Sequence, residues 1–229
     1  MTDTLNIRKI KDFLISLVFP KRCVICGDVI SFNEHLCDSC GEDVNSETII
    51  RFIQYAKSGE TIVCVSPFKY EGKIRKAILK FKFQGHTEYA QPFAKIISEK
   101  ICKNFKINNI DINDVDYVCA VPLSEKRIFE RGYNQSELLA KEISKNLSIP
   151  MNNVLKKIRE TSLQHSLDAK EREKNLFNAF SVAKGVNIRD KNFILCDDII
   201  TTGNTLKECV KALKNCGAGK IVCCTIASM

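Results

Sequence analysis

The stretch that most constrains the fold is Asn192–Leu206, which reads NFILCDDIITTGNTL. An apolar run, 193–196, ends in the acidic pair Asp197 and Asp198, and a threonine-rich turn follows. Beyond the turn, apolar residues recur at helical spacing until Gly217, a residue typical of a helix end. The pattern therefore predicts a strand, an acidic pair, a loop and a helix, in that order.

This order of elements favours a phosphorylated sugar as ligand. A helix N-terminus offers unpaired backbone N–H groups and a partial positive charge, which suit a phosphate. Two adjacent carboxylates at the end of a strand can hold ribose hydroxyls or Mg²⁺, which prefers oxygen ligands. The simpler interpretation is a buried strand, a turn and an amphipathic helix, because Asp and Thr are common turn residues. The chain contains neither a nucleotide P-loop motif nor a dinucleotide-binding glycine motif.

Length and composition indicate a soluble globular protein. The 229 residues suffice for one sizeable domain and one small one, with 45% apolar and 27% charged residues. The net charge of +8 favours a polyanion as partner, whether nucleic acid, a phosphorylated substrate or an anionic membrane surface. We expect a cytoplasmic location, because no stretch matches a membrane span or a secretory signal.

Four of the twelve cysteines form two C-x-x-C knuckles, Cys23 with Cys26 and Cys37 with Cys40. Four thiolates complete a tetrahedron and leave no open position for catalysis, so the pattern predicts a structural Zn²⁺ site. An iron–sulfur cluster or redox pairs are the alternatives. A glycine after each knuckle would allow a tight turn, and His35 is expected to be a solvated loop residue. The other cysteines lie in apolar runs and are expected to act as small hydrophobic residues.

The N-terminal half otherwise predicts helices and one broken strand. Residues 7–18 place apolar side chains on one helical face, which indicates a helix docked on its own domain or, alternatively, lying on a membrane surface. We predict a connecting helix over Thr48–Lys57 and a strand over Thr61–Tyr70 that is broken at Pro67. The segment Lys73–Phe83 predicts an amphipathic helix. Its basic row, Lys73, Lys76 and Lys80, is either a solvated face or a phosphate contact.

A second strand end carries arginines. The apolar run 115–121 predicts a strand that stops at Pro122, and Arg127 and Arg131 follow in a loop or first helical turn. Open α/β sheets bind ligands at such strand ends, so the two arginines could clamp a pyrophosphate or be ordinary surface residues. Asn134 is expected to cap the next helix. After a short strand at 154–158, the polar stretch 159–179 predicts either a linker or a lid.

The acidic pair and the T-T-G-x-T turn resemble the phosphoribosyl pyrophosphate (PRPP) loop of type I phosphoribosyltransferases. The chain as a whole is similar to the ComF family, whose members join a four-cysteine zinc module to such a domain. The resemblance rests on CVIC and CDSC, YEGKIRKAILKFKFQG, VPLSEKRIFERGYNQSELLA, the segment Leu155–Phe180 and ILCDDIITTGNT. Asn204 fills the variable place in the turn, and Cys196 stands where valine is expected, which changes packing rather than chemistry.

The resemblance implies an α/β fold with a twisted, mostly parallel sheet flanked by helices and a small zinc ribbon. Residues 1–58 would form the N-terminal helix and zinc module, and residues 59–229 the phosphoribosyltransferase-like domain. Asp197 and Asp198 would hold the ribose hydroxyls of PRPP, directly or through Mg²⁺. The remaining implied roles are a phosphate cradle (Thr201, Thr202, Gly203, Asn204, Thr205), a pyrophosphate clamp (Arg127, Arg131 and the backbone near Pro122) and a mobile hood (Arg159, Gln164, Arg172).

Three functions stay open on the sequence. The first is a phosphoribosyltransferase that needs no covalent nucleophile and has an unknown acceptor, linked by the resemblance to DNA uptake in natural transformation. The second is a non-catalytic module that keeps the sugar-phosphate site but binds single-stranded DNA through its basic rows, Lys73 to Lys82, and the zinc ribbon. The third is an adaptor whose zinc module docks a competence helicase or another uptake protein.

Overall fold

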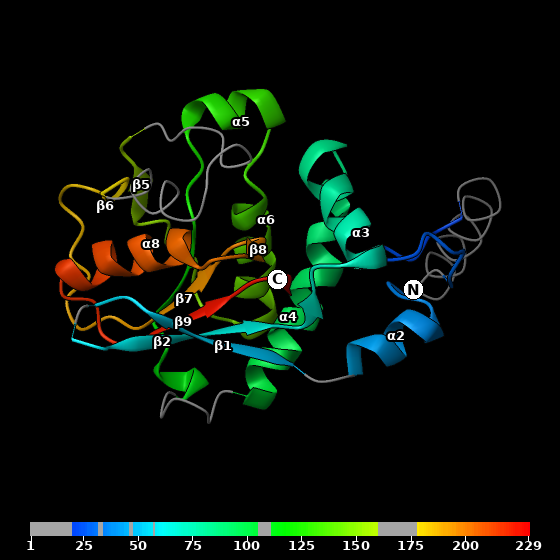
Figure 1. Ribbon diagram of the computed structural model, residues 1–229, viewed down its shortest axis with the longest axis horizontal. Coiled ribbons are helices and arrows are strands. Elements are labelled where there is room, and N and C mark those ends of the chain that lie inside the picture. The colour runs from blue at the N-terminus through cyan, green and yellow to red at the C-terminus, as the bar shows by residue number, and fades with distance from the viewer. Residues whose placement is uncertain (1–19, 32–33, 46–47, 57, 105–110, 160–177) are drawn as a thin grey trace, which may run out of the picture. The chain divides into compact units, whose positions relative to one another are not determined.

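The computed structural model describes residues 20–31, 34–45, 48–56, 58–104, 111–159 and 178–229 (Figure 1). The chain divides into two compact units, Met1–Ser46 and Glu47–Met229. This division lies before the expected boundary at 58/59, because residues 49–54 are a strand of the second unit. The amphipathic segment 7–18 and the expected hood residues Gln164 and Arg172 lie outside the described residues.

The described part of the first unit contains the two cysteine knuckles and the helix α2, Asp38–Asn45. The first knuckle turns back at Gly27, whose φ of +87° is a conformation that glycine adopts without strain. The Gly27 N–H donates to the Cys23 carbonyl at 2.9 Å. The glycine after the second knuckle, Gly41, is instead a residue of α2, so only the first glycine makes a left-handed turn.

The second unit is built on a five-stranded sheet of order β1-β2-β9-β7-β4. β1 pairs with β2 in antiparallel fashion, and the other three pairings are parallel. The strands are β1 (Ile49–Gln54), β2 (Thr61–Ser66), β9 (Ile221–Cys224), β7 (Phe193–Cys196) and β4 (Tyr117–Ala120). The predicted mostly parallel α/β architecture is therefore confirmed.

The predicted connecting helix over Thr48–Lys57 is wrong, because this segment contains β1. Its sequence IIRFIQ is rich in β-branched and aromatic residues. The strand pairs with β2 along its whole length, from Ile49 opposite Ser66 to Gln54 opposite Thr61. Antiparallel pairing with β2, the next strand along the chain, thus overrides the helix expectation at this sheet edge.

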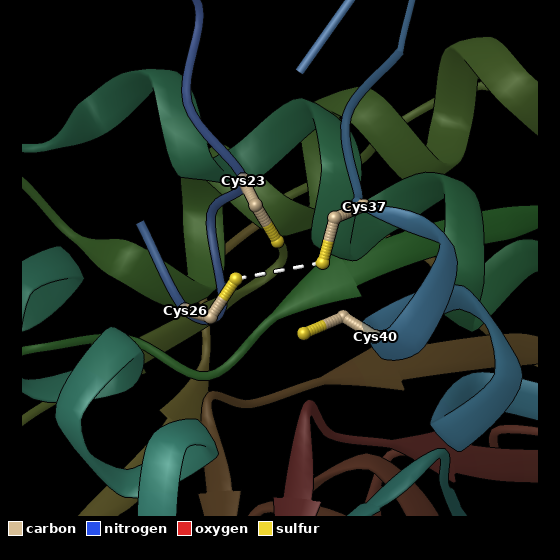
Figure 2. A group of neighbouring side chains, drawn as sticks. All are labelled: Cys23, Cys26, Cys37 and Cys40. Atoms are coloured by element: carbon tan, nitrogen blue, oxygen red, sulfur yellow. Dashed lines mark hydrogen bonds between the residues drawn. The ribbon is translucent and has the colours of Figure 1, made fainter. Parts of the chain in front are cut away.

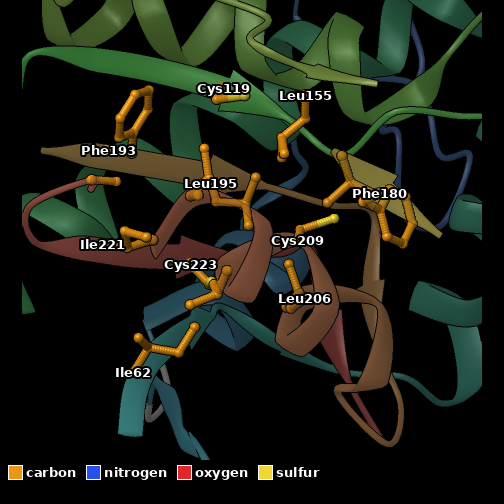
Figure 3. Packing of buried hydrophobic residues seen from close by; sticks show 14 of the residues in the cluster. Ile62, Cys119, Leu155, Phe180, Phe193, Leu195, Leu206, Cys209, Ile221 and Cys223 are labelled. Atoms are coloured by element: carbon orange, nitrogen blue, oxygen red, sulfur yellow. The ribbon is translucent and has the colours of Figure 1, made fainter. Parts of the chain in front are cut away.

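Helices cover both faces of the sheet. α8 (Asn204–Asn215) packs on one face, where it shares a hydrophobic cluster with alternate residues of the strands (Figures 1 and 3). α4 (Ala90–Asn104) and α6 (Gln135–Leu147) pack together on the opposite face, next to β2, β4 and β7. Cluster members drawn in Figure 3 include Ile62, Cys119, Leu155, Phe180, Phe193, Leu195, Leu206, Cys209, Ile221 and Cys223. The strand cysteines are buried, as predicted for small hydrophobic residues.

Shorter elements complete the unit. β3 (Phe68–Lys69), β10 (Ala227–Ser228) and β8 (Ile199–Ile200) form a small parallel sheet, and β5 (Leu155–Lys157) pairs with β6 (Phe180–Val182). The predicted helix after β3 is α3 (Gly72–Phe83), and α5 (Glu125–Arg131) precedes α6. Two 3₁₀ turns cover Thr87–Tyr89 and Ile112–Asp114. Among the helices that the structure describes, none has the length and apolar character needed to cross a membrane.

Candidate functional site

The stretch that the sequence singled out folds as predicted. β7 ends at Cys196, Asp197 and Asp198 follow at its carboxyl end, and α8 begins at Asn204 after the turn. Gly203 is the N-cap of α8 with φ +80°, which a residue with a Cβ rarely adopts. The backbone N–H groups of the first turn of α8 therefore lie directly after the two carboxylates, as a phosphate cradle requires.

Asp197 is held in one orientation by two donors. The Ser136 hydroxyl and the Asp198 N–H donate to the same oxygen, Oδ1 of Asp197, at 2.8 and 2.9 Å. Burial, together with the neighbouring Asp198 carboxylate, raises the pKa of Asp197 to about 7, although both donors and Lys82 act in the opposite direction. Two carboxylates placed this close repel each other, so the pair favours the binding of a cation.

One internal cation already contacts the pair. Nζ of Lys82, at the end of α3, lies 2.9 Å from Oδ2 of Asp198, and the two side chains are only 17% and 13% exposed. The sequence indicated a possible phosphate contact for the basic helix but gave no sign that Lys82 pairs with the acidic loop.

Arg131 lies near the same two acids. Burial lowers the pKa of Arg131, and the negative charges of Asp198 and Asp197 act against this shift. The Arg131 guanidinium donates to Oε1 of Gln135 at 3.1 Å and lies over the Phe83 ring, 4.8 Å from its centroid. Arg131 is thus a cation fixed beside the carboxylates.

The other clamp residues are placed less directly. The Val121 N–H donates to the Cys196 carbonyl at 2.9 Å, which joins the loop containing Pro122 to the end of β7. Arg127 lies in α5, and its positive charge also lowers the pKa of Arg131. Arg127 lies in the first turn of α5, as expected, whereas Arg131 lies in its last turn. The predicted cap is confirmed: Oδ1 of Asn134 accepts from the Ser136 N–H at 3.1 Å.

The threonine-rich turn is supported from β1. Nη1 of Arg51 donates to the Thr201 carbonyl at 2.5 Å, while Thr201 and Thr202 remain exposed. Ile53 of the same strand lies against Gly203, 3.5 Å from where a Cβ would stand. Thr205, like Asn204, is partly exposed in the first turn of α8. Because β1 was expected to be helical, sequence reasoning missed Arg51.

Only one expected hood residue is described. Arg159 follows β5 and is exposed, and it begins the stretch that continues outside the described residues. On the other side of that stretch, the Asn178 N–H donates to a carboxylate oxygen of Glu208 at 3.2 Å. Glu208 is a buried residue of α8, so the stretch re-enters the described structure on the helix that follows the threonine-rich turn.

In the first unit, the four predicted thiol ligands converge (Figure 2). Their sulfur atoms all lie within 4.8 Å of one another, and Sγ of Cys26 is 3.5 Å from Sγ of Cys37. Zn–S bonds of about 2.3 Å in a tetrahedron place the sulfurs roughly 3.8 Å apart, so the arrangement fits a zinc ion. His35 is partly buried, and its carbonyl accepts from the Val24 N–H at 3.4 Å.

The thiols differ in how readily they ionise without a metal. Burial opposes ionisation of Cys23, but N–H groups of residues 26, 37 and 25 outweigh it and lower the pKa of Cys23 to about 7. Burial raises the pKa of Cys26 to about 11 and raises that of Cys40 further. A bound zinc ion would bind all four as thiolates.

Comparison with known proteins agrees with both units. The description "Double zinc ribbon domain" matches residues 14–49, and "Phosphoribosyl transferase domain" matches residues 134–228. The four cysteines therefore form a zinc ribbon, which supports a structural Zn²⁺. The second unit has the phosphoribosyltransferase fold that its sheet and loop predicted.

Three relatives align with most of the chain. "Competence protein F" of Haemophilus influenzae is 30% identical over 201 residues, which are 87% of this chain and 81% of that protein. "DNA utilization protein YhgH" of Escherichia coli K12 is 26% identical over 202 residues, 87% of this chain and 86% of that protein. "Competence protein ComFC" of Bacillus subtilis is 26% identical over 200 residues, 84% and 78% of the two chains. Together with the zinc ribbon and the acidic loop, these matches show that the chain belongs to the ComF family.

Proposed function

We propose that this protein binds PRPP with Mg²⁺ and transfers its phosphoribosyl group to an acceptor. The observation that carries the proposal is an acidic pair that precedes a helix N-terminus in the chain and is paired with internal cations. Asp197 and Asp198 are followed by β8 and the turn that leads into α8, Lys82 contacts Asp198, and the charges of both acids act on Arg131. Such a site offers separate partners to a phosphate, to ribose hydroxyls and to a pyrophosphate.

Each part of PRPP has a partner of matching chemistry. Thr201, Thr202, Gly203, Asn204 and Thr205 would hold the 5′-phosphate through backbone N–H groups and hydroxyls. Asp197 and Asp198 would hold the ribose hydroxyls. Arg131, with Arg127 and the backbone near Pro122, would neutralise the pyrophosphate.

The two carboxylates also fit Mg²⁺, because oxygen donors are its preferred ligands. Asp197 uses only Oδ1 for its two internal hydrogen bonds, and Asp198 holds its Oδ2 against an ammonium group. When bound, Mg²⁺ would neutralise negative charge on the pyrophosphate. The protein's own contribution is to fix the Asp197 carboxylate through Ser136 and the loop backbone, and the Asp198 carboxylate through Lys82.

The reaction would be a displacement at the anomeric carbon of the ribose. The bond from this carbon to the pyrophosphate oxygen breaks, its electrons leave with the pyrophosphate, and the acceptor forms the new bond. Positioning and charge stabilisation by fixed cations suffice for such a step, so no covalent nucleophile is needed. The proposed hood of Arg159, Gln164 and Arg172 would exclude water from the reactive sugar.

The names of the relatives suggest the biological process in which the activity is used. They refer to competence and to DNA utilization. We therefore propose that the activity belongs to the handling of imported DNA, with other DNA-uptake proteins as partners, and that the zinc ribbon is the part that docks such a partner.

Calorimetric titration of PRPP into the purified protein, with and without Mg²⁺, tests the proposal. We expect micromolar binding that depends on Mg²⁺. Ribose 5-phosphate, which lacks the pyrophosphate, is the matched control and should bind much more weakly. An absence of PRPP binding would mean that the site has another use.

The second candidate function is non-catalytic binding of single-stranded DNA. It is favoured by the basic row on α3, since Lys73, Lys76 and Lys80 are all exposed. Reversal of charge in the double variant Lys76→Glu and Lys80→Glu should then weaken DNA binding, and the affinity of the unmodified protein should fall steeply with salt. DNA binding that is insensitive to salt would exclude this candidate. Because it keeps the sugar-phosphate site, transfer of the phosphoribosyl group, rather than PRPP binding alone, distinguishes the first candidate from it.

A further inference from the structure

Lys82 is paired with Asp198, one of the two carboxylates proposed to bind a divalent cation. Its ammonium group lies 2.9 Å from Asp198, in a setting where both side chains are largely shielded from water. An ion pair of this kind is not strongly screened by solvent. One of the two carboxylates that would bind a metal is therefore neutralised by the protein itself.

The position of Lys82 is fixed by a buried glutamine. Gln135 is 1% exposed, and its Nε2 donates to the Lys82 carbonyl at 3.1 Å while its Oε1 accepts from Arg131 at 3.1 Å. Tyr133 also holds the last turn of α3, because its hydroxyl donates to the Phe81 carbonyl at 2.5 Å. The same side chain, Gln135, thus places two cations beside one acidic pair.

Two electrostatic requirements follow from this arrangement. A divalent cation at Asp198 would meet the Lys82 ammonium group as a like charge, so the ion pair opposes metal binding in the free protein. A pyrophosphate brings several negative charges next to Lys82 and Arg131, and it can replace the carboxylate as the partner of the ammonium group. Metal and pyrophosphate therefore favour each other's binding through Lys82.

We propose that Lys82 exchanges partners on substrate binding, from Asp198 in the free protein to the pyrophosphate of PRPP in the complex. The exchange rests on the proposed function. It makes Lys82 both a direct substrate-binding residue and the counter-ion that keeps Asp198 neutralised until substrate arrives. The expected consequence is weak binding of a divalent cation alone and much tighter binding of the cation together with PRPP.

The test is a comparison of Lys82→Met with the unmodified protein in two titrations. With Mn²⁺ alone, Lys82→Met should bind the metal about tenfold more tightly, because the competing charge is gone. With PRPP in the presence of Mg²⁺, the same variant should bind about tenfold or more weakly, because a charged hydrogen-bond donor to the pyrophosphate is lost. A purely structural role for Lys82 would weaken both titrations, so the opposite signs are the diagnostic result.

Two further variants control the comparison. Lys95→Met removes an exposed lysine of α4 that has no role in the candidate site and should leave both titrations unchanged. Lys82→Arg keeps the charge and should restore most of the PRPP affinity while leaving Mn²⁺ binding weak. Thermal unfolding of each variant identifies any loss of folding, and a misfolded Lys82→Met would be replaced by Lys82→Gln.

The outcomes separate the two proposals. If the unmodified protein binds PRPP but Lys82→Met behaves like Lys95→Met in either titration, the exchange is overturned and the proposed function stands. If the unmodified protein binds no PRPP with either metal, the proposed function fails and the exchange fails with it.

Discussion

The two candidate sites of this protein are assembled in opposite ways. All four zinc ligands lie between Cys23 and Cys40, on two knuckles that the chain forms locally. The PRPP-type site combines Lys82 of α3, Arg131 of α5, Ser136 of α6 and the acidic pair after β7. Its parts are far apart in the sequence and meet because the parallel sheet brings the ends of β4 and β7 together.

The difference also concerns what stabilises each site. Among the described residues of the first unit, the buried apolar side chains are Cys23, Val24, Ile25, Cys40 and Val44. These described residues alone provide little stabilisation, so we expect a bound metal to supply most of the folding free energy of this part of the chain. The second unit buries an extensive cluster between the sheet and its helices, so its site can exist without a bound metal. The comparison teaches that one site depends on its ion, and the other on the core beneath it.

Removal of two zinc ligands is expected to have the largest effect. The double variant Cys23→Ser and Cys26→Ser should lower the metal content from about one Zn per chain to none, at a cost on the order of 10 kcal/mol of binding free energy. The second unit should keep its unfolding transition, because its core contains no zinc ligand. Metal analysis together with thermal unfolding measures both quantities.

Cys102→Ser is the matched control, since Cys102 is an exposed cysteine of α4 outside the thiol cluster. It should keep its zinc. Detection of iron in the unmodified protein, or of no metal, would contradict the zinc assignment. Unfolding of the second unit upon zinc loss would contradict the inference that its stability does not depend on the metal.

Replacement of the acidic pair should impair PRPP binding and leave the zinc content unchanged, in contrast to removal of the zinc ligands. Asp197→Asn combined with Asp198→Asn should weaken Mg²⁺-dependent PRPP binding by about 100-fold or more, because two charged oxygen ligands are lost. Zinc content and folding should be unchanged. Calorimetry of PRPP binding is the measurement, and Asp190→Asn, at an exposed position with φ +59°, is the control. An unchanged PRPP affinity in the double variant would refute the site assignment.

The single variant Asp197→Asn should show how much the ionised Asp197 carboxylate destabilises the second unit. The pKa of Asp197 is raised to about 7, so the folded state holds a proton that the unfolded chain releases near pH 4. Stability conferred by this group is therefore lost as pH rises from about 4 to about 7. Asparagine removes that loss while its Oδ1 can still accept from Ser136 and from the backbone.

We expect Asp197→Asn to raise the free energy of unfolding by about 1–2 kcal/mol at pH 8 and by little at pH 5. Denaturant unfolding at the two pH values, followed for the second unit, measures the difference. An equal change in the free energy of unfolding at both pH values would show that ionisation of Asp197 does not destabilise the folded state.

The smallest effect is expected at Arg51, which supports the loop rather than the ligand. Arg51→Ala removes the donor to the Thr201 carbonyl and should weaken PRPP binding about fivefold, the equivalent of one hydrogen bond of about 1 kcal/mol. Arg51→Lys should lose less. Arg75→Ala, at an exposed position of α3, is the control and should bind PRPP normally. A loss as large as that of the acidic pair would mean that Arg51 contacts the substrate directly.

Contiguous patterns in the sequence were sufficient for several features. The two knuckles predicted the thiol cluster, and the apolar run, acidic pair and threonine-rich turn predicted β7, the loop and α8. Asn134 was identified as a helix cap, and the apolar stripe of Lys73–Phe83 as the buried face of α3. Each of these depends on residues within one or two turns of one another, where spacing alone fixes which side chains meet.

Only the tertiary structure decided the remaining features. The segment 49–54 is rich in β-branched and aromatic residues, but only its pairing with β2 decides that it is a strand rather than the expected helix. Lys82, Ser136 and Arg51 join the acidic loop from elements far away in the chain. Their roles depend on which strand ends and helix ends the sheet places together, and that choice is made by burial of the whole core rather than by any local sequence.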